Sequence, residues 1–152
     1  MSLGTAIAIA SRVHENQTDK GGKPYILHPL RLMMRLRTDD EELMSIAVLH
    51  DVVEDSDVTI EELRGLGFSE RVLAALDLLT HKGSDTYDEY VRLIATNRDA
   101  TLVKIEDLRD NSDITRLKGL TEKDHDRLKK YNKSYVYLTS VLRMTESLGR
   151  IA

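Results

Sequence analysis

The chain has 152 residues, the length of one ordinary domain, and a hydrophobic content of 41%, which is enough for a single core. Its formal net charge is −4, and charged residues of both signs are mixed along the sequence without a basic tract, which excludes a general nucleic-acid-binding protein. The absence of cysteine excludes disulfide bonds and thiolate chemistry. We therefore expect one cytoplasmic domain over residues 1–152, without nucleic acid as a partner.

The N-terminal segment predicts a first helix. It reads M-S-L-G-T-A-I-A-I-A, which is apolar without a basic lead, and then becomes charged at S-R-V-H-E-N-Q. A signal peptide has a basic lead, and a membrane span needs about 20 apolar residues, so this pattern argues against both. We expect an amphipathic helix here and no membrane as a partner.

A loop follows the first helix at D-K-G-G-K-P-Y, residues 19–25. Two glycines and a proline favour a turn, and two lysines add local positive charge. Because the chain has no basic tract, any phosphate binding must be local. His14, on the first helix close to this loop, is interpreted as a supporting or structural residue rather than a metal ligand.

Helical patterns continue along almost the whole chain. Four pairs have capping-box spacing or a related one: Asp39 with Glu42, Thr59 with Glu62, Thr86 with Glu89, and Thr121 with Asp124. No segment alternates convincingly with period two, and no internal repeat is present. The predicted fold is therefore all-α, a single-domain helical bundle. Helices are expected at residues 3–17, 29–36, 40–55, 60–65, 70–81, 87–96, 99–114 and 122–148.

The third predicted helix ends in an unusual polar cluster, V-L-H-D-V-V-E-D at residues 48–55. Residues 43–49 are apolar on nearly every side, which indicates a buried helix. At about 100° per residue, His50 and Glu54 continue one buried stripe, while Asp51 and Asp55 continue the next. An uncompensated buried charge costs several kcal/mol. Either the helix end is frayed and solvated, as most carboxylates are, or a bound group compensates the charges.

Two other places favour a bound group. His28 lies between apolar residues at the start of a predicted helix, and Lys104, Asp107 and Asn111 fall at i, i+3 and i+7 on one helix face. Taken alone, the first is interpreted as a structural histidine and the second as a solvated polar stripe. Taken together with the cluster, these segments offer two imidazoles and two carboxylates from three helices: His28, His50, Asp51 and Asp107.

This set of side chains predicts a divalent metal site. Nitrogen and oxygen ligands without thiolate suit manganese, iron(II) or magnesium better than a structural zinc ion. Two carboxylates also balance the charge of the cation. Glu54 and Asp55, one turn further along, are then placed to orient or deprotonate a water molecule.

The order of these residues is similar to the H…HD…D signature of the HD superfamily of metal-dependent phosphohydrolases. Three longer segments resemble the hydrolase domain of RelA/SpoT-type alarmone enzymes, in particular the stand-alone small alarmone hydrolases. They are H-E-N-Q-x-x-K-G-G-K-P-Y-I-L-H-P at residues 14–29, H-D-V-V-E-D at 50–55, and K-I-E-D-x-x-x-N at 104–111. The similarity runs in order from about residue 6 to about residue 142.

The resemblance implies an all-α HD-type bundle and a Mn²⁺-dependent enzyme that removes the 3′-pyrophosphate from (p)ppGpp. Iron(II) and magnesium are alternative cofactors. Carried over by position, His28, His50, Asp51 and Asp107 would bind the metal, Glu54 and Asp55 would act on the water, and Lys20, Tyr25 and Asn111 would bind the substrate. The family's synthetase and regulatory domains have no counterpart here, so alarmone synthesis is not expected.

Two departures from the family pattern lie on the nucleoside side of the expected site. The family loop usually begins R-K-S-G, with its arginine against guanine, whereas this chain has Asp19-Lys20-Gly21-Gly22. The family continues R-L-H-N where this chain has Leu108-Arg109-Asp110-Asn111. Because a carboxylate replaces a cation that stacks on a base, we expect weaker guanine preference. The alternatives are another phosphorylated nucleotide or dinucleotide as substrate, or a nucleotide-binding module without turnover.

Overall fold

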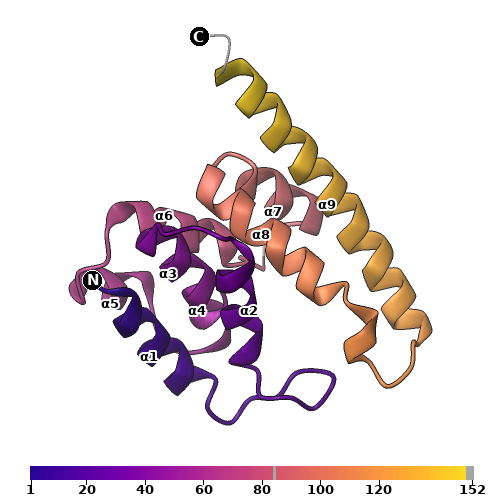
Figure 1. Ribbon diagram of the computed structural model, residues 1–152, viewed down its shortest axis with the longest axis horizontal. Helices are drawn as coiled ribbons and strands as arrows, with labels where there is room; N and C mark the ends of the chain where they lie inside the picture. The colour runs from indigo at the N-terminus through magenta and orange to yellow at the C-terminus, as the bar shows by residue number, and fades with distance from the viewer. Residues whose placement is uncertain (84, 150–152) are drawn as a thin grey trace.

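The computed structural model describes residues 1–83 and 85–149, and its described part is built from helices (Figure 1). In chain order they are α1 (Leu3–Val13), α2 (Leu27–Arg35), α3 (Glu41–Leu49), α4 (Val52–Asp55), α5 (Ile60–Gly65), α6 (Glu70–Leu79), α7 (Tyr87–Ile94), α8 (Arg98–Asn111), the 3₁₀ helix η1 (Ile114–Arg116) and α9 (Glu122–Gly149). Within the described ranges no strand forms, and Thr18 and Pro24 make an isolated β-bridge. The prediction of an all-α fold is confirmed.

The helix starts follow the capping signals of the sequence closely, with one exception. Thr59 and Thr86 each form a complete capping box with the glutamate three residues later. At the start of α3 the cap is Asp40 rather than Asp39, because the Asp40 carboxylate accepts the backbone N–H groups of Glu42 and Leu43. The first helix ends at Val13 rather than at residue 17, since the following residues enter the loop.

The predicted helix over residues 40–55 is two helices, α3 and α4, separated at His50 and Asp51. Asp51 has φ −100° and ψ −7°, which stay in the right-handed helical region but depart from the ideal α-helical values of about −63° and −42°. On a continuous helix, neighbouring side chains point about 100° apart. At this break the two side chains instead converge, with His50 Nε2 2.9 Å from Asp51 Oδ2. The expectation of one continuous helix was therefore wrong, and the break brings both residues to one site.

Helix α3 lies at the centre of the core, as its sequence predicts. It packs against α1, α2, α6 and α8, and Ile46, Ala47, Val48 and Leu49 are all fully buried. At about 25 cal/mol per Å² of apolar surface, burying side chains of this kind is the main source of stability for the bundle. The polar residues that follow Leu49 are therefore held at the end of a rigid, buried helix.

Helix α9 is the longest helix and packs along α8. Leu138 is fully buried on its inner face, whereas residues 143–148 are exposed. Figure 1 shows this C-terminal part of α9 projecting beyond the other helices. Across the residues described, none of the helices combines the length and the hydrophobicity that a membrane span requires.

Candidate active site

Four predicted metal ligands come together where α2, α8 and the α3–α4 break meet. His28 Nε2 lies 3.2 Å from Asp107 Oδ1 and 3.8 Å from Asp51 Oδ2. His50 Nε2 lies 2.9 Å from Asp51 Oδ2 and 3.8 Å from Asp107 Oδ1. Ligand atoms of His28, His50 and Asp107 all fall within 4.8 Å of one another. The structure thus places the four residues as one compact, largely buried group.

The hydrogen bonds of the two imidazoles direct their Nε2 atoms toward this group. His50 Nδ1 lies 2.9 Å from the carbonyl oxygen of Ala47, so it donates its proton there. His28 Nδ1 lies 2.7 Å from Asp110 Oδ2, an acceptor of the same kind. Among the described residues neither buried Nε2 atom has a hydrogen-bond partner. A histidine whose Nδ1 donates to an oxygen and whose Nε2 is unpaired has the usual arrangement of a metal ligand, so these residues fit a divalent cation.

The electrostatics of the group also favour a cation. Burial opposes ionisation of Asp51, but the neighbouring His50 outweighs it and lowers the pKa of Asp51 to about 2. Burial likewise opposes ionisation of Asp107, whose pKa is nevertheless lowered by Lys104 and the two histidines. For His28, burial alone would lower the pKa, but the nearby carboxylates of Asp107 and Asp110 raise it to about 9. Two ionised carboxylates therefore favour positive charge between them.

Three further side chains hold the two carboxylates. The Tyr25 hydroxyl donates to Asp51 Oδ2 at 2.6 Å. On the other side, Lys104 Nζ donates to Asp107 Oδ2 at 2.8 Å, and Asn111 Nδ2 donates to Asp107 Oδ1 at 2.5 Å. Tyr25 and Asn111, which we expected to bind substrate, thus also fix the orientation of the carboxylates.

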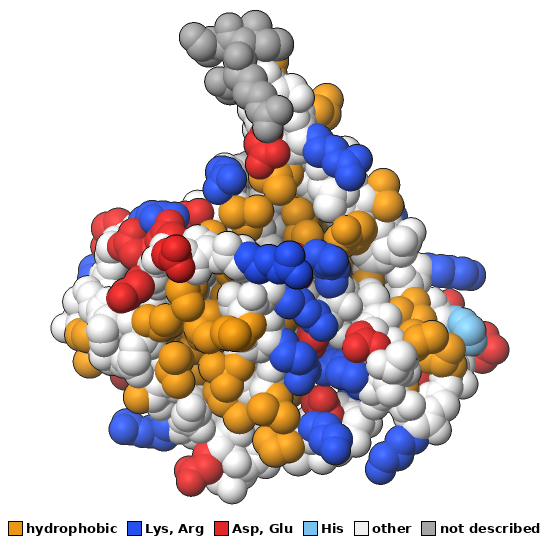
Figure 2. Space-filling model, in the orientation of Figure 1, with side chains coloured by type: hydrophobic (Ala, Val, Ile, Leu, Met, Phe, Trp, Pro, Cys, Tyr) orange, Lys and Arg blue, Asp and Glu red, His pale blue; other side chains and the backbone are white. Residues whose placement is uncertain are grey.

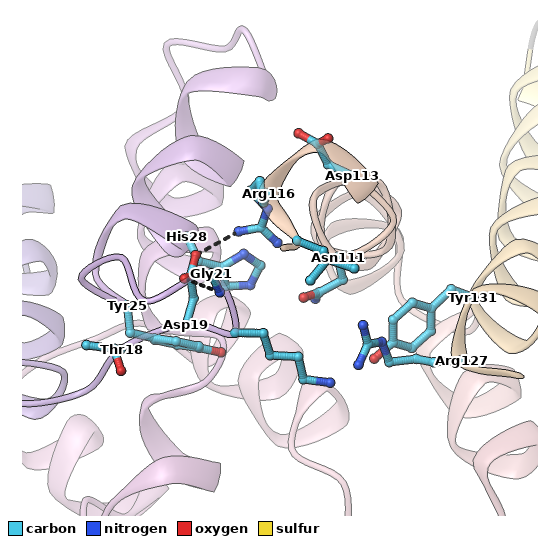
Figure 3. Close-up of a pocket in the computed structure, with 12 residues that line it drawn as sticks. Thr18, Asp19, Gly21, Tyr25, His28, Asn111, Asp113, Arg116, Arg127 and Tyr131 are labelled. Atoms are coloured by element: carbon cyan, nitrogen blue, oxygen red, sulfur yellow. Dashed lines mark hydrogen bonds and ion pairs between the residues drawn. The ribbon is translucent and has the colours of Figure 1, made fainter. Parts of the chain in front are cut away.

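Two cavities adjoin the group formed by His28, His50, Asp51 and Asp107, which are candidate metal ligands. We call this set of four residues the metal-binding group. The first, which we call the loop cavity, has a volume of about 280 Å³ and lies between the 19–25 loop, η1 and the start of α9 (Figure 3). The second, the Glu54 cavity, has a volume of about 410 Å³ and includes His50, Asp51 and Asp107 in its wall. Tyr25, Asn111 and Tyr131 line both. The two cavities together provide room for a ligand that extends on both sides of the metal-binding group.

The two expected catalytic residues have different positions. Glu54 lines the Glu54 cavity, and its Oε2 accepts the backbone N–H of His81 at 3.1 Å. Asp55 is not among the described lining residues of either cavity, and its Oδ2 accepts from Gln17 Nε2 at 2.9 Å. Gln17 in turn is 2.7 Å from Nδ1 of the buried His14. Glu54 therefore faces the cavity that contains His50, Asp51 and Asp107, whereas Asp55 is held in a hydrogen-bonded chain outside it.

Asp19 has a role in the loop that its sequence position did not indicate. Its Oδ1 accepts the backbone N–H groups of Gly21 and Lys23, each at 2.9 Å, and its Oδ2 lies 3.3 Å from Arg116 Nη1. Gly21 approaches the Arg116 carbonyl so closely that a Cβ atom would lie 2.5 Å from that oxygen. The interpretation of Asp19 as a carboxylate presented to a base is therefore revised, because both of its oxygens are engaged.

The loop cavity instead gains cations that sequence reasoning missed. Lys20 lines it, and Arg116 and Arg127 line it as well, with Tyr131 beside Arg127 (Figure 3). Arg127 and Tyr131 are four residues apart on α9, a spacing that places them on one helix face. That spacing was a usable signal in the sequence, whereas Arg116 lies in a short 3₁₀ turn without any periodic pattern.

Asp110 is a second residue whose importance was missed. It is fully buried, and three arginines bind its carboxylate together with His28 Nδ1: Arg31 at 2.8 Å, Arg35 at 2.9 Å and Arg116 at 3.2 Å. Burial opposes its ionisation, but these partners hold its pKa well below the usual range. His28, Arg31 and Arg35 fall at i, i+3 and i+7 on α2, which was the available signal for a shared buried acid.

Comparison with known proteins gives consistent relatives, although no family model matches the chain. A guanosine-3′,5′-bis(diphosphate) 3′-pyrophosphohydrolase of Aquifex aeolicus is 37% identical over 116 residues, which cover 70% of this chain and 16% of the relative. A Vibrio cholerae protein of the same name is 45% identical over 65 residues, covering 41% of this chain and 9% of the relative. The chain thus spans about a sixth or less of the length of these curated relatives.

A solved structure is similar over nearly the whole length of both chains. It is described as a metazoan ortholog of SpoT that hydrolyzes ppGpp and plays a role in starvation responses. The superposition has a TM-score of 0.70 and 25% sequence identity, and it covers 94% of each chain. The bundle described above is therefore the fold of that structure.

Proposed function

We propose that this chain, which resembles the hydrolase domain of RelA/SpoT-type enzymes in sequence and in fold, hydrolyses (p)ppGpp and releases pyrophosphate from its 3′ position. The observation that carries the proposal is the pair of buried, unpartnered Nε2 atoms facing two carboxylates at the junction of two cavities. A domain of this kind over residues 1–152 needs a divalent ion, a water-activating group and cations for phosphates. The chain offers residues that could hold such an ion, a carboxylate beside them and cations for phosphates.

Manganese is the cofactor that we propose, with iron(II) and magnesium as alternatives, and His28, His50, Asp51 and Asp107 would hold it. The donor set of two imidazole nitrogens and two carboxylates suits these ions, since it contains no thiolate and leaves open positions. When bound, a divalent cation supplies a Lewis acid that lowers the pKa of water and neutralises phosphate charge. The remaining roles, proton transfer and substrate binding, are assigned to side chains of the protein.

Glu54 is the proposed general base. Its carboxylate lines the cavity that contains His50 and Asp51, and it is exposed, so it exchanges protons with solvent. Water attacks the phosphorus joined to the ribose 3′ oxygen, and Glu54 accepts the proton that the water releases. The bond between that phosphorus and the 3′ oxygen breaks, pyrophosphate leaves, and the 3′ oxygen takes up a proton. Asp55 is assigned a supporting role through its hydrogen bond with Gln17.

Substrate binding is assigned to the cations and aromatic rings of the two cavities. Lys20, Arg116 and Arg127 line the loop cavity, and Lys130 lines the Glu54 cavity. Charge-assisted hydrogen bonds from such groups are the strong contacts available to phosphate. Tyr25 and Asn111 line both cavities, next to the carboxylates that they hold, so they are proposed to contact the substrate where it passes the metal-binding group.

Guanine preference follows from Arg116 in this proposal. Arg116 offers the loop cavity a guanidinium group, the kind of side chain that stacks on bases, and the Asp19 carboxylate faces this group. Arg116 of η1 thus supplies the cation that the arginine at the position of Asp19 would supply in the family. We therefore propose ordinary guanine preference rather than the weakened preference that the sequence alone suggested.

A hydrolysis panel tests the proposed function. The purified full chain is supplied with Mn²⁺, Fe²⁺ or Mg²⁺ and tested with ppGpp, GTP, dNTPs and NADPH, with identification of the products. We expect pyrophosphate and GDP from ppGpp, with the highest rate in Mn²⁺. Release of phosphate from another nucleotide at a higher kcat/KM would replace the substrate, and binding of ppGpp without turnover under every metal would indicate a binding module.

A further inference from the structure

A third cavity is separate from the two cavities beside the metal-binding group, and its described lining residues are arginines. Its volume is about 400 Å³, and its described lining residues are Arg35, Arg37 and Arg109. Figure 2 shows Lys and Arg side chains gathered over α2 and α8 on this face. In a chain with a formal net charge of −4, this is a concentrated positive site. We refer to it as the arginine cavity.

The charges of the arginine cavity are incompletely balanced. Arg109 Nη1 contacts Glu106 Oε1 at 2.9 Å, and Arg35 Nη1 contacts Asp110 Oδ1 at 2.9 Å. The Asp110 carboxylate is shared with two other arginines and with His28, so it neutralises only part of the Arg35 charge. Arg37 makes no ion pair with any residue that the structure describes. The cavity therefore retains positive charge that an anion would neutralise.

Arg37 is also held in a strained backbone conformation. Its φ is +48°, and among the described residues the others with positive φ are all glycines. It occupies the position just after the C-terminal cap of α2, where glycine is the usual residue. An arginine there costs about 1 kcal/mol relative to glycine. The α2 C-terminus favours cations, but this does not account for Arg109, which reaches the same cavity from α8.

We propose that the arginine cavity binds a small polyphosphate-bearing anion. Guanidinium groups present paired N–H donors that match phosphate oxygens, and the volume of the cavity is within the range of small-molecule sites. The site is separate from the two cavities beside the metal-binding group, with which it shares none of its described lining residues.

The same cavity is connected to the metal-binding group through Asp110. Arg35 contacts Asp110 Oδ1, and Asp110 Oδ2 accepts from His28 Nδ1 at 2.7 Å. Arg31 donates two hydrogen bonds to Asp110, so the carboxylate stays in place when Arg35 turns toward an anion. With less positive charge beside it, Asp110 attracts the His28 Nδ1 proton more strongly. Anion binding at the arginine cavity therefore changes the hydrogen bond of His28, a residue of the metal-binding group.

Titration of the full metal-free chain with inorganic tripolyphosphate tests this proposal, with calorimetry for affinity and NMR for arginine Nε–H and histidine Nδ1–H groups. Metal-free protein avoids chelation of the probe. We expect shifts at Arg37 and Arg109, and a shift of the His28 Nδ1–H signal. Arg37→Gln and Arg109→Gln should each weaken binding about tenfold, the usual effect of one charge-assisted hydrogen bond.

Arg92→Gln is the matched control, because it removes the same charge from an exposed arginine on α7. It should leave the affinity unchanged. Equal weakening by all three variants would show diffuse charge attraction, and an effect of Arg127→Gln alone would place the probe in the loop cavity. Either result would overturn the proposed site. Binding without any change at His28 would overturn the connection to the metal-binding group.

Discussion

His28 separates two buried carboxylates of α8 whose surroundings differ. Asp107 faces its Nε2 atom at 3.2 Å, with Lys104 in contact and Asp51 adding a second carboxylate nearby. Asp110 faces its Nδ1 atom at 2.7 Å. Three cations surround this second carboxylate: Arg31, Arg35 and Arg116. We call these regions the metal side and the arginine side of His28.

The difference shows how two aspartates of one helix, Asp107 and Asp110, are suited to two different roles although they are three positions apart. On the metal side, two carboxylates face the Nε2 atoms of two imidazoles, a donor set that suits a divalent cation. On the arginine side, charge is over-balanced by guanidinium groups, which makes the carboxylate a fixed support for the His28 ring. Burial is similar on both sides, so the partners decide the role. The following variants test this distinction.

Removing a ligand on the metal side should have the largest effect. His50→Ala leaves the cation with three protein ligands, and we expect loss of metal together with a rate below about 1% of wild type, since even outer-shell changes cost 10–100-fold. Calorimetry and turnover measure the two quantities. His125→Ala, an exposed histidine on α9, is the control. Retained metal affinity in His50→Ala would show that the cation is bound elsewhere.

Changing the proposed base should leave the metal side intact but stop its chemistry. Glu54→Gln keeps the size of the side chain and removes its charge, so turnover should fall about 10²-fold while metal affinity is unchanged. Asp55→Asn should have a smaller effect, because Asp55 contacts Gln17 rather than the cavity. Full activity in both variants would mean that no carboxylate of this segment is needed to activate the water.

Neutralising the arginine side should mainly affect stability. In Asp110→Asn, three arginines lose a buried charged partner, and we expect unfolding free energy to fall by about 3 kcal/mol. Metal affinity should fall about tenfold, since His28 loses its carboxylate partner. Denaturant unfolding and metal titration measure these effects. Asp126→Asn, at an exposed position on α9, serves as the control, and a larger loss of metal affinity than in His50→Ala would reverse our assignment of the two sides.

The pH dependence of the metal-free chain should follow from His28. Its pKa is raised from 6.5 to about 9, because the contacts with Asp107 and Asp110 outweigh burial. A group whose pKa is higher in the folded state than in the unfolded state stabilises the fold fully at pH values below its unfolded-state pKa. That stabilisation is lost as the pH rises through its folded-state pKa. Thermal stability of the metal-free protein should therefore decrease between about pH 6.5 and pH 9. A His28→Gln variant whose stability falls equally over this range would assign the effect to another group.

The smallest expected effect concerns the cation that belongs to both the arginine side and the loop cavity. Arg116→Gln should raise KM for ppGpp about 3- to 10-fold with kcat nearly unchanged, as loss of uniform binding does. Asp19→Arg should also raise KM, because it removes the acceptor that orders the loop. A lower KM in Asp19→Arg would restore the view that residue 19 meets the base directly.

That the residues of the metal side lie together could be predicted from the sequence, because most of its signals are local. H-D follows a buried apolar run, Asp107 shares a helix face with two polar partners, and His28 was added from the start of another predicted helix; that these residues bind a metal stays a prediction. The arginine side depends on tertiary contacts: Asp110 meets Arg31 across 79 residues of sequence, and nothing around Asp110 in the sequence indicates that it is buried. The break at His50 was missed because every residue of that segment is compatible with a helix.

The crossing of the 19–25 loop and η1 has a consequence for how the protein folds. Asp19 and Arg116 are 97 residues apart in sequence, and Gly21 closes the same crossing against the Arg116 backbone. Contacts between such distant segments close large loops and are entropically expensive to form early. We therefore expect the loop cavity, which we propose to hold the substrate, to be completed late in folding.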